Sequence, residues 1–203
     1  MVLTSNGAHQ RLIESAVRLL HAGSYGVVSV KDLCADAGVG KGSFYHFFAS
    51  KRALALAALD EHWERYRTGL FEKAFARDVP PLEQITRFFR LLAVWNAELA
   101  AEDKVFGCPF GNLGLEVATQ DEVIRKKVLE VFGHITNYFA RAIQGAYEAG
   151  DIGEVDAQVA AGRLLALCPG IASPCEGGKR RASLRAFRRR SDQPHRPGRC
   201  ALA

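Results

Sequence analysis

Apolar side chains recur every three or four residues along most of this chain, with polar residues on the opposite side of each segment. The first segment covers about residues 8–22 and is followed by Gly23. Its apolar residues share one helical face: Leu12, Ile13, Ala16, Leu19 and Leu20. This spacing is typical of an amphipathic helix, and no segment alternates in the way a half-buried strand requires. The pattern predicts an all-α protein.

Two short helices separated by a tight turn are predicted within residues 30–52, VKDLCADAGVGKGSFYHFFASKR. The first, 31–37, has Ser29 as a candidate N-cap and ends at Gly38, which tolerates the left-handed conformation. The second covers about 41–48 and turns its phenylalanines, Phe44, Phe47 and Phe48, inward. Its outward residues are Lys41, Gly42, Ser43, Tyr45 and His46. A pair of this size is a helix-turn-helix, whose second helix enters the major groove of DNA.

The later segments are also helical. A long helix starts near Ser50 and continues past Phe71 to about Phe75, before the Pro80–Pro81 pair ends the connection. Further helices are predicted over about 82–100, 112–118 and 121–149, and from about Val155 to Leu167, where Cys168, Pro169 and Gly170 are expected to break the last one. We therefore divide the chain into a three-helix DNA-binding domain, 1–52, a larger helical domain, 53–168, and a tail, 169–203; the family resemblance given below implies that the second domain binds ligand and dimerises.

The net charge of +5 is concentrated in the tail. From Pro169 onward nine basic residues face two acidic ones, a charge of +7, which leaves −2 for residues 1–168. DNA binding is therefore expected to depend on the charges of residues 1–52, here called the head. There Glu14, Asp32 and Asp36 oppose a larger set of cations: Arg11, Arg18, Lys31, Lys41, Lys51 and Arg52. This modest excess suits contact with phosphates.

The tail is rich in Arg, Pro, Gly and Ser and offers no amphipathic helix. One explanation is an out-of-frame translation from about Cys168, because shifted GC-rich coding sequence yields such a mixture. The other is a genuine basic tail that adds nonspecific DNA affinity. Resequencing the gene distinguishes them.

The segment GVGKGSFYHFFASKRALALAAL resembles the DNA-binding signature of the TetR family of transcriptional repressors, and the resemblance covers about residues 8–60. It implies that Lys41, Gly42, Ser43 and Tyr45 lie at the groove. It further implies that His46 and Lys51 bind phosphate, and that Ser29 and Val30 touch the flanking backbone. The partners implied are a palindromic double-stranded operator, a second copy of the chain and a small-molecule effector that releases the homodimer from DNA.

A second segment, FGCPFGNLGLEVATQ at 106–120, resembles a TetR subgroup with a Gly-Cys-x-x-Gly-Asn sequence, which includes repressors that respond to electrophiles or small unsaturated acids. Cys108 at a helix start could be a reactive thiol, since the helix dipole and free amides stabilise a thiolate. The alternative is a small buried residue in a tight turn. The resemblance places the ligand pocket among the later helices, with these candidates: Phe88, Leu92, Trp95, Cys108, Asn112, Phe132, Asn137 and Tyr138. Asn112 and Asn137 are singled out, because an amide within an apolar bundle needs a polar partner.

Other classes of function find little support. The five cysteines form no CxxC pair and have no histidine at ligand spacing, so we expect no metal and no cofactor. There is no Ser/His/Asp order or phosphate loop, and we expect no enzyme. No apolar run reaches the roughly 18 residues of a membrane span and the start lacks a signal-peptide pattern, which predicts a cytoplasmic protein without membrane contact. A DNA-binding protein that relies on the basic tail, and a regulator with a protein partner, remain alternatives.

Overall fold

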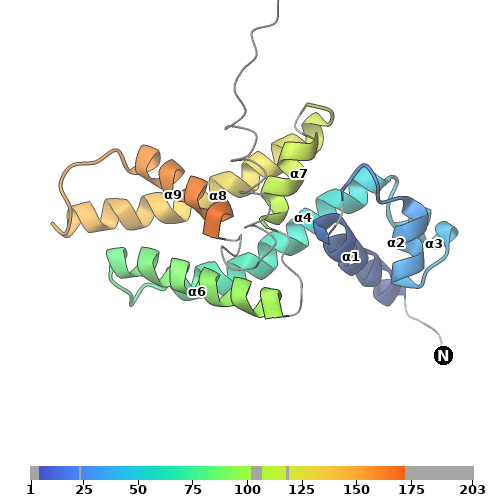
Figure 1. Ribbon diagram of the computed structural model, residues 1–203, viewed down its shortest axis with the longest axis horizontal. Helices are drawn as coiled ribbons and strands as arrows, with labels where there is room; N and C mark the ends of the chain where they lie inside the picture. The colour runs from blue at the N-terminus through green and yellow to red at the C-terminus, as the bar shows by residue number, and fades with distance from the viewer. Residues whose placement is uncertain (1–4, 23, 102–106, 118, 172–203) are drawn as a thin grey trace, which may run out of the picture. The chain divides into compact units, whose positions relative to one another are not determined.

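Helices α1 to α3 form the amino-terminal part of the fold (Figure 1). The computed structural model describes residues 5–22, 24–101, 107–117 and 119–171, all within one compact unit. Helix α1 spans Ser5–Ala22, α2 Val30–Ala37 and α3 Lys41–Phe47, and α1 packs against both of the others. Leu12, Leu33 and Phe44 are fully buried between them. The apolar spacing read from the sequence thus becomes the core of a three-helix head.

The turn between α2 and α3 follows the predicted chemistry. Ser29 adopts an extended conformation and caps α2, and Gly38 ends it with a φ of 61°. An L-residue with a side chain rarely adopts this left-handed conformation, so the position favours glycine. Val39 is half-buried against the core. The predicted helix-turn-helix is confirmed.

The predicted long connecting helix is present in three consecutive parts. Helix α4 spans Lys51–Tyr66 and begins after Ser50, whose hydroxyl accepts a hydrogen bond from the amide of Ala53 at 3.1 Å. A π-helical segment, η1, follows at Arg67–Phe71, and α5 completes the run at Glu72–Ala74. Figure 1 shows α4 leading from the head toward α6 and α8. The sequence predicted the length of this run but not its π-helical segment.

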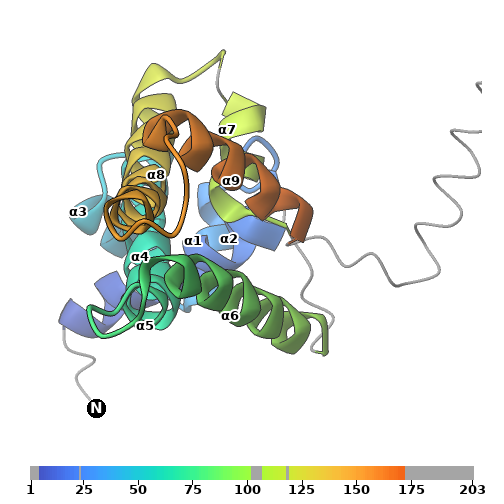
Figure 2. The same ribbon diagram turned by 90° about the vertical axis from the view of Figure 1, so that its left-hand side faces the viewer.

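The remaining helices are α6 (Pro81–Ala101), α7 (Pro109–Val117), α8 (Glu122–Glu148) and α9 (Ala157–Ile171). Helix α8 is the centre of this part, because it packs against α4, α6, α7 and α9 (Figure 2). Helix α7 starts three residues before the predicted 112, since proline is favoured at the first position of a helix. The predicted break at 168 is wrong, because α9 continues to Ile171; proline loses one hydrogen bond there but keeps a helical φ.

The described residues form helices and connections without a strand, so the all-α prediction is confirmed. Within the described ranges, no helix is both long and apolar enough to pass through a bilayer. The predicted tail lies outside the described residues from position 172 onward.

Candidate DNA-binding head and effector cavity

Helix α3 combines an anchored side with an exposed side. Phe44 is fully buried and Phe48, which caps the helix, is 6% exposed. His9 of α1 stacks on Phe48 at 4.9 Å between ring centroids and meets the half-buried Phe47 edge-on at 5.6 Å. The residues predicted to meet DNA are all exposed: Lys41, Gly42, Ser43, Tyr45 and His46. The aromatic run therefore fixes α3 against α1 and leaves its polar side open to a major groove.

The start of α2 is held by a reciprocal pair of hydrogen bonds. The Ser29 hydroxyl accepts the amide of Asp32 at 3.2 Å, and the Asp32 carboxylate accepts the Ser29 amide at 2.9 Å. The Ser29 hydroxyl also donates to that carboxylate at 2.6 Å, and these bonds from Ser29 lower the pKa of Asp32. Ser29 is exposed and Val30 half-buried. The predicted contact of these two residues with the DNA backbone stays a prediction.

Lys51 is placed differently from a free phosphate-binding lysine. Its ammonium group donates to the backbone carbonyls of Tyr25 at 2.7 Å and Val28 at 3.0 Å, and lies 4.3 Å from the centroid of the Tyr25 ring. Two of its three N–H groups are thus used inside the protein. Lys51 therefore ties the α1–α2 loop to the start of α4. Its predicted contact with a DNA phosphate stays a prediction.

Several other cations of the head also have partners within the protein. Arg18 pairs with Asp36 at 2.7 Å, and Arg11 Nε donates to the carbonyl of Ala37 at 2.9 Å. These contacts hold α1 against α2. Arg52 lies 3.5 Å from the Asp121 carboxylate, the N-cap of α8. In the described part of the head, Lys31 and Lys41 are exposed and take part in no ion pair or side-chain hydrogen bond.

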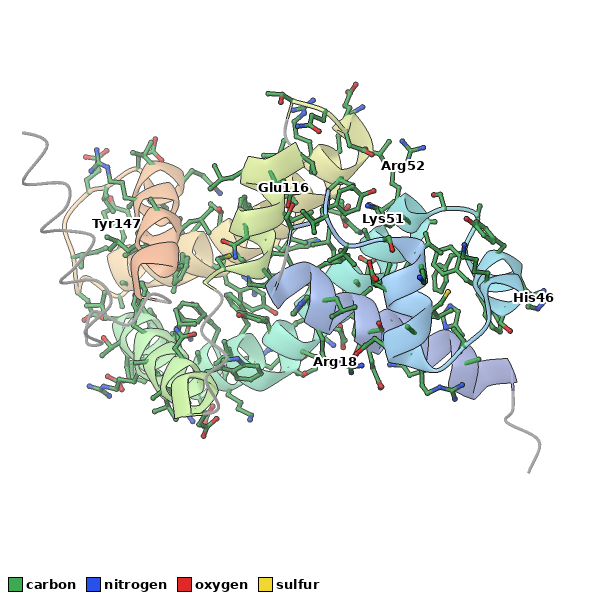
Figure 3. All side chains as sticks on the ribbon, turned by 45° about the vertical axis from the view of Figure 1, so that its right-hand side comes forward. Arg18, His46, Lys51, Arg52, Glu116 and Tyr147 are labelled. Carbon is green, nitrogen blue, oxygen red and sulfur yellow. The ribbon has the colours of Figure 1, made fainter. Side chains whose placement is uncertain are left out.

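Glu116 joins the later helices to the head and was not predicted. Its carboxylate accepts the amides of Tyr25 at 2.8 Å and Gly26 at 2.7 Å and a short hydrogen bond from the Ser24 hydroxyl. Burial raises the pKa of Glu116, but these hydrogen bonds and the charge of Lys51 outweigh it, so the pKa is lowered overall. Figure 3 shows Glu116 beside Lys51 and Arg52. No sequence pattern links residues 90 positions apart.

An apolar cavity of about 290 Å³ lies among α4, α6, α7, α8 and α9. Its lining combines predicted and unpredicted residues: Tyr66, Phe71, Phe88, Leu92, Cys108, Phe110, Phe132, Ile135, Gly162, Leu165, Ala166 and Cys168. The lining includes Phe88, Leu92, Cys108 and Phe132 from the predicted set. None of these lining residues carries a charge, and the polar groups are the Tyr66 hydroxyl and two thiols. Such a cavity suits an uncharged ligand, because a buried charge without a partner is costly.

The other predicted pocket residues lie outside this lining. The Trp95 ring packs against Tyr66 at 5.6 Å between ring centroids, and Tyr138 packs against Phe71 at 5.0 Å. Both therefore contact residues of the cavity lining without being part of it. Asn112 is exposed near Gly107, and Asn137 is exposed in a polar groove between α8 and α9. The premise that these amides lie within the apolar bundle is wrong, since each occupies the outer side of its helix.

Cys108 lies directly before Pro109, the first residue of α7. Its sulfur accepts the amide of Gly111 at 3.4 Å, and its carbonyl accepts the amide of Asn112 at 2.9 Å, so it caps the helix. Burial raises the pKa of the Cys108 thiol more than the hydrogen bonds from Gly111 and Phe110 lower it. Cys168 shares the cavity, and burial and the nearby Cys108 raise its pKa to about 12. Both groups are therefore mainly thiols at neutral pH, which slows nucleophilic attack.

The geometry agrees with comparisons to known proteins. Residues 12–58 match the family model for bacterial regulatory proteins of the tetR family, and residues 84–191 match that for the tetracyclin repressor-like C-terminal domain. The chain belongs to the TetR family. It is therefore a DNA-binding transcriptional regulator and not an enzyme, as predicted.

Curated relatives cover most of the chain at modest identity. The transcriptional regulator AcuR of Cereibacter sphaeroides is 31% identical over 74% of this chain and 66% of its own length. The repressor DhaR of a Mycobacterium strain is 27% identical over 70% of this chain and 69% of its own. An uncharacterised regulator of Lactococcus lactis is 28% identical over 64% and 65%. The matched part of this TetR-family chain thus spans about two thirds of these relatives.

Solved structures share the fold. A TetR regulator from Chloroflexus aurantiacus aligns with a TM-score of 0.72 at 26% identity, covering 82% of each chain. A regulatory protein TetR from Rhodobacter sphaeroides gives 0.67 at 26% identity, covering 90% of this chain and 96% of its own. AibR, crystallised with isovaleryl coenzyme A and operator DNA, gives 0.66 at 18% identity over 84% and 90%. The last likeness concerns the fold alone.

Proposed function

We propose that this TetR-family protein is a homodimeric repressor that binds a palindromic operator and leaves it when a small uncharged molecule fills the cavity. The observation that carries the proposal is the 290 Å³ apolar cavity, whose wall helices α4 and α7 also contact the DNA-binding head. At the density of protein interiors this volume holds about 15 non-hydrogen atoms. The predicted effector is a small aromatic or branched apolar compound.

The operator side of the proposal rests on the exposed side of α3. Lys41, Ser43 and Tyr45 offer donors and acceptors to base edges and phosphates, and Gly42 lets the backbone approach the DNA. A monomer covers one half-site, so two heads spaced about 34 Å apart are needed for tight binding to a palindrome. Exposed apolar residues of α9, Val159 and Leu167, support an interface with a second copy.

A covalent effector at Cys108 is the finer alternative. Its support is the position of the sulfur in the cavity lining, where a bound electrophile would meet it. The raised pKa of the Cys108 thiol argues against fast reaction with dilute electrophiles. Release by an electrophile such as N-ethylmaleimide that persists in Cys108→Ala would refute sensing at Cys108, whereas loss of the response would support it.

The first experiment is a selection of bound sequences from random duplex DNA at physiological salt. We expect a palindromic motif. On that motif Tyr45→Ala should weaken binding by about 5-fold to 150-fold, the cost of one base or phosphate contact. Tyr147→Ala is the matched control, because Tyr147 is 44% exposed, against 58% for Tyr45, and lies away from the head in Figure 3. Binding without enrichment that survives Tyr45→Ala would instead favour the basic tail.

The effector side is tested with N-phenyl-1-naphthylamine, an uncharged fluorophore of suitable shape. Binding should raise its fluorescence and lower operator affinity. Leu165→Trp, which places a large ring at a half-buried residue of the cavity lining, should abolish the fluorescence response, whereas Leu115→Trp on an exposed site should leave it unchanged. Equal fluorescence responses from the two variants would show that the cavity is not the binding site.

A further inference from the structure

Helix α7 touches the cavity at one end and the DNA-binding head at the other. Its first turn carries Phe110, which lines the cavity beside Cys108, and its last turn carries Glu116. The helix has nine residues, a length of about 13 Å at 1.5 Å per residue. A rigid element this short carries a displacement at its start to its end, because little bending is available within two and a half turns.

The Glu116 carboxylate accepts hydrogen bonds from three consecutive residues of the loop before α2. The hydroxyl of Ser24 and the amide of Gly26 donate to Oε1, and the amide of Tyr25 donates to Oε2. Both oxygens are thus occupied by the same three residues of one loop. Hydrogen bonds between a carboxylate and backbone amides are among the stronger ones in proteins, so this contact defines where the loop lies.

The same loop is also held by Lys51. The ammonium group binds the carbonyls of Tyr25 and Val28, while the carboxylate of Glu116 binds the amides. The loop leads directly into Ser29, the cap of α2, and Lys51 opens α4. Because α3 packs on α2, the position of this loop also sets the orientation of α3, the helix predicted to enter the major groove, relative to the later helices.

We propose that Glu116 is a positioning residue for operator binding: its carboxylate holds the 24–28 loop in the DNA-binding orientation, and a ligand in the cavity weakens operator binding by shifting α7 and loosening that contact. The second half of this inference rests on the proposed function, and the first half does not. Glu116 would act on the start of α2 through Ser24, Tyr25 and Gly26.

The test compares Glu116→Ala, Glu116→Gln and Glu116→Asp with the control Glu148→Gln on the full chain. Glu148 is an exposed glutamate at the far end of α8. Operator affinity should fall by about 5-fold to 150-fold in Glu116→Ala, the usual range of coupling between sites, and less in Glu116→Gln, which keeps one acceptor oxygen. The control should bind as the wild type does. If Glu116→Ala does not fold, the Gln and Asp variants decide the comparison.

Hydrogen exchange separates positioning from general destabilisation. The amides of Tyr25 and Gly26 should exchange faster in the Glu116 variants, while those in the core of α8, such as Phe139, keep wild-type rates. With wild-type protein, N-phenyl-1-naphthylamine should raise exchange at Tyr25 and Gly26 as it lowers operator affinity. In Glu116→Ala the same probe should bind but change operator affinity no further.

The outcomes distinguish the positioning role of Glu116 from the transmission of ligand binding through its contact with the loop. Wild-type operator affinity in Glu116→Ala, or unchanged exchange at Tyr25 and Gly26, overturns the positioning role. A probe response in Glu116→Ala as large as in the wild type overturns transmission through this contact. If the probe does not bind wild-type protein, the effector part of the proposed function fails, and the affinity and exchange measurements still decide the positioning role.

Discussion

Replacing Gly69 with alanine should destabilise the fold, although Gly→Ala within a helix normally stabilises it. Gly69 lies in the π-helical segment η1, and a Cβ built there would lie 2.6 Å from Cζ3 and 3.1 Å from Cη2 of Trp95. Carbon atoms pack at about 3.5–4.0 Å, so the indole ring must move. The ring cannot move freely, because it is half-buried and packs on Tyr66.

The magnitude follows from two opposing contributions. An extra methyl group forced into a packed site costs about 1–3 kcal/mol, whereas alanine gains about 1 kcal/mol over glycine in a helix. Gly133 of α8 is the matched control, because a Cβ there meets nothing within 4 Å. Gly133→Ala should therefore stabilise the protein by up to about 1 kcal/mol, and Gly69→Ala should lie about 1–3 kcal/mol below it.

Urea unfolding followed by circular dichroism measures both variants at one protein concentration, since the proposed dimerisation would make stability concentration-dependent. In a Trp95→Leu background the Gly69→Ala penalty should disappear, which a double-mutant cycle reports as a coupling energy. The reasoning is refuted if Gly69→Ala stabilises the wild-type protein as much as Gly133→Ala does.

Three further predictions follow from burial and charge. Phe44→Ala, at a fully buried site, should lower the free energy of unfolding by about 3–5 kcal/mol and abolish operator binding, and a loss under about 1 kcal/mol in urea would contradict the assignment of Phe44 to the core. Because the folded-state pKa of Glu116 is lowered, its stabilisation is present above the usual glutamate pKa of about 4.3 and is lost as the pH falls through the folded value. The difference in unfolding free energy between wild type and Glu116→Gln should therefore close in acid. A difference independent of pH would mean that the charge of Glu116 is not involved. Because burial raises the pKa of Cys108, its rate of alkylation by iodoacetamide, followed by mass spectrometry, should keep rising beyond the usual thiol pKa of about 8.5, and a plateau below about pH 8 would show an activated thiolate.

Local chemistry made the head predictable from sequence. The cap at Ser29, the left-handed Gly38 and the buried side of Phe44 each depend on neighbours within a few residues, and all three are as predicted. The helical period also placed Leu12 and Ala16 correctly toward the interior. Such features are read from spacing, because a helix sets which residues share a side.

Long-range contacts were not predictable in the same way. Lys51 reads as a phosphate ligand, yet its partners are carbonyls 26 and 23 residues away. Glu116 carries no motif, and its importance depends on a loop 90 to 92 residues earlier in the chain. The π-helical segment at 67–71 shifts the helical phase by one residue, which no apolar period reveals. Asn137 was misplaced because a single polar residue beside an apolar stripe can face either way.

Most cations of the head have partners within the protein, and this determines how strongly its affinity for DNA depends on ionic strength. If all six basic side chains of the head met phosphates, a dimer would displace about twelve counterions, and affinity would fall with a slope of about −11 in log salt. With Arg11, Arg18, Lys51 and Arg52 engaged within the protein, Lys31 and Lys41 leave about four, a slope near −4. The affinity of the head should then fall by about 150-fold between 50 and 200 mM salt. We therefore expect the selectivity of the head to depend on the fit of α3 to base edges more than on charge.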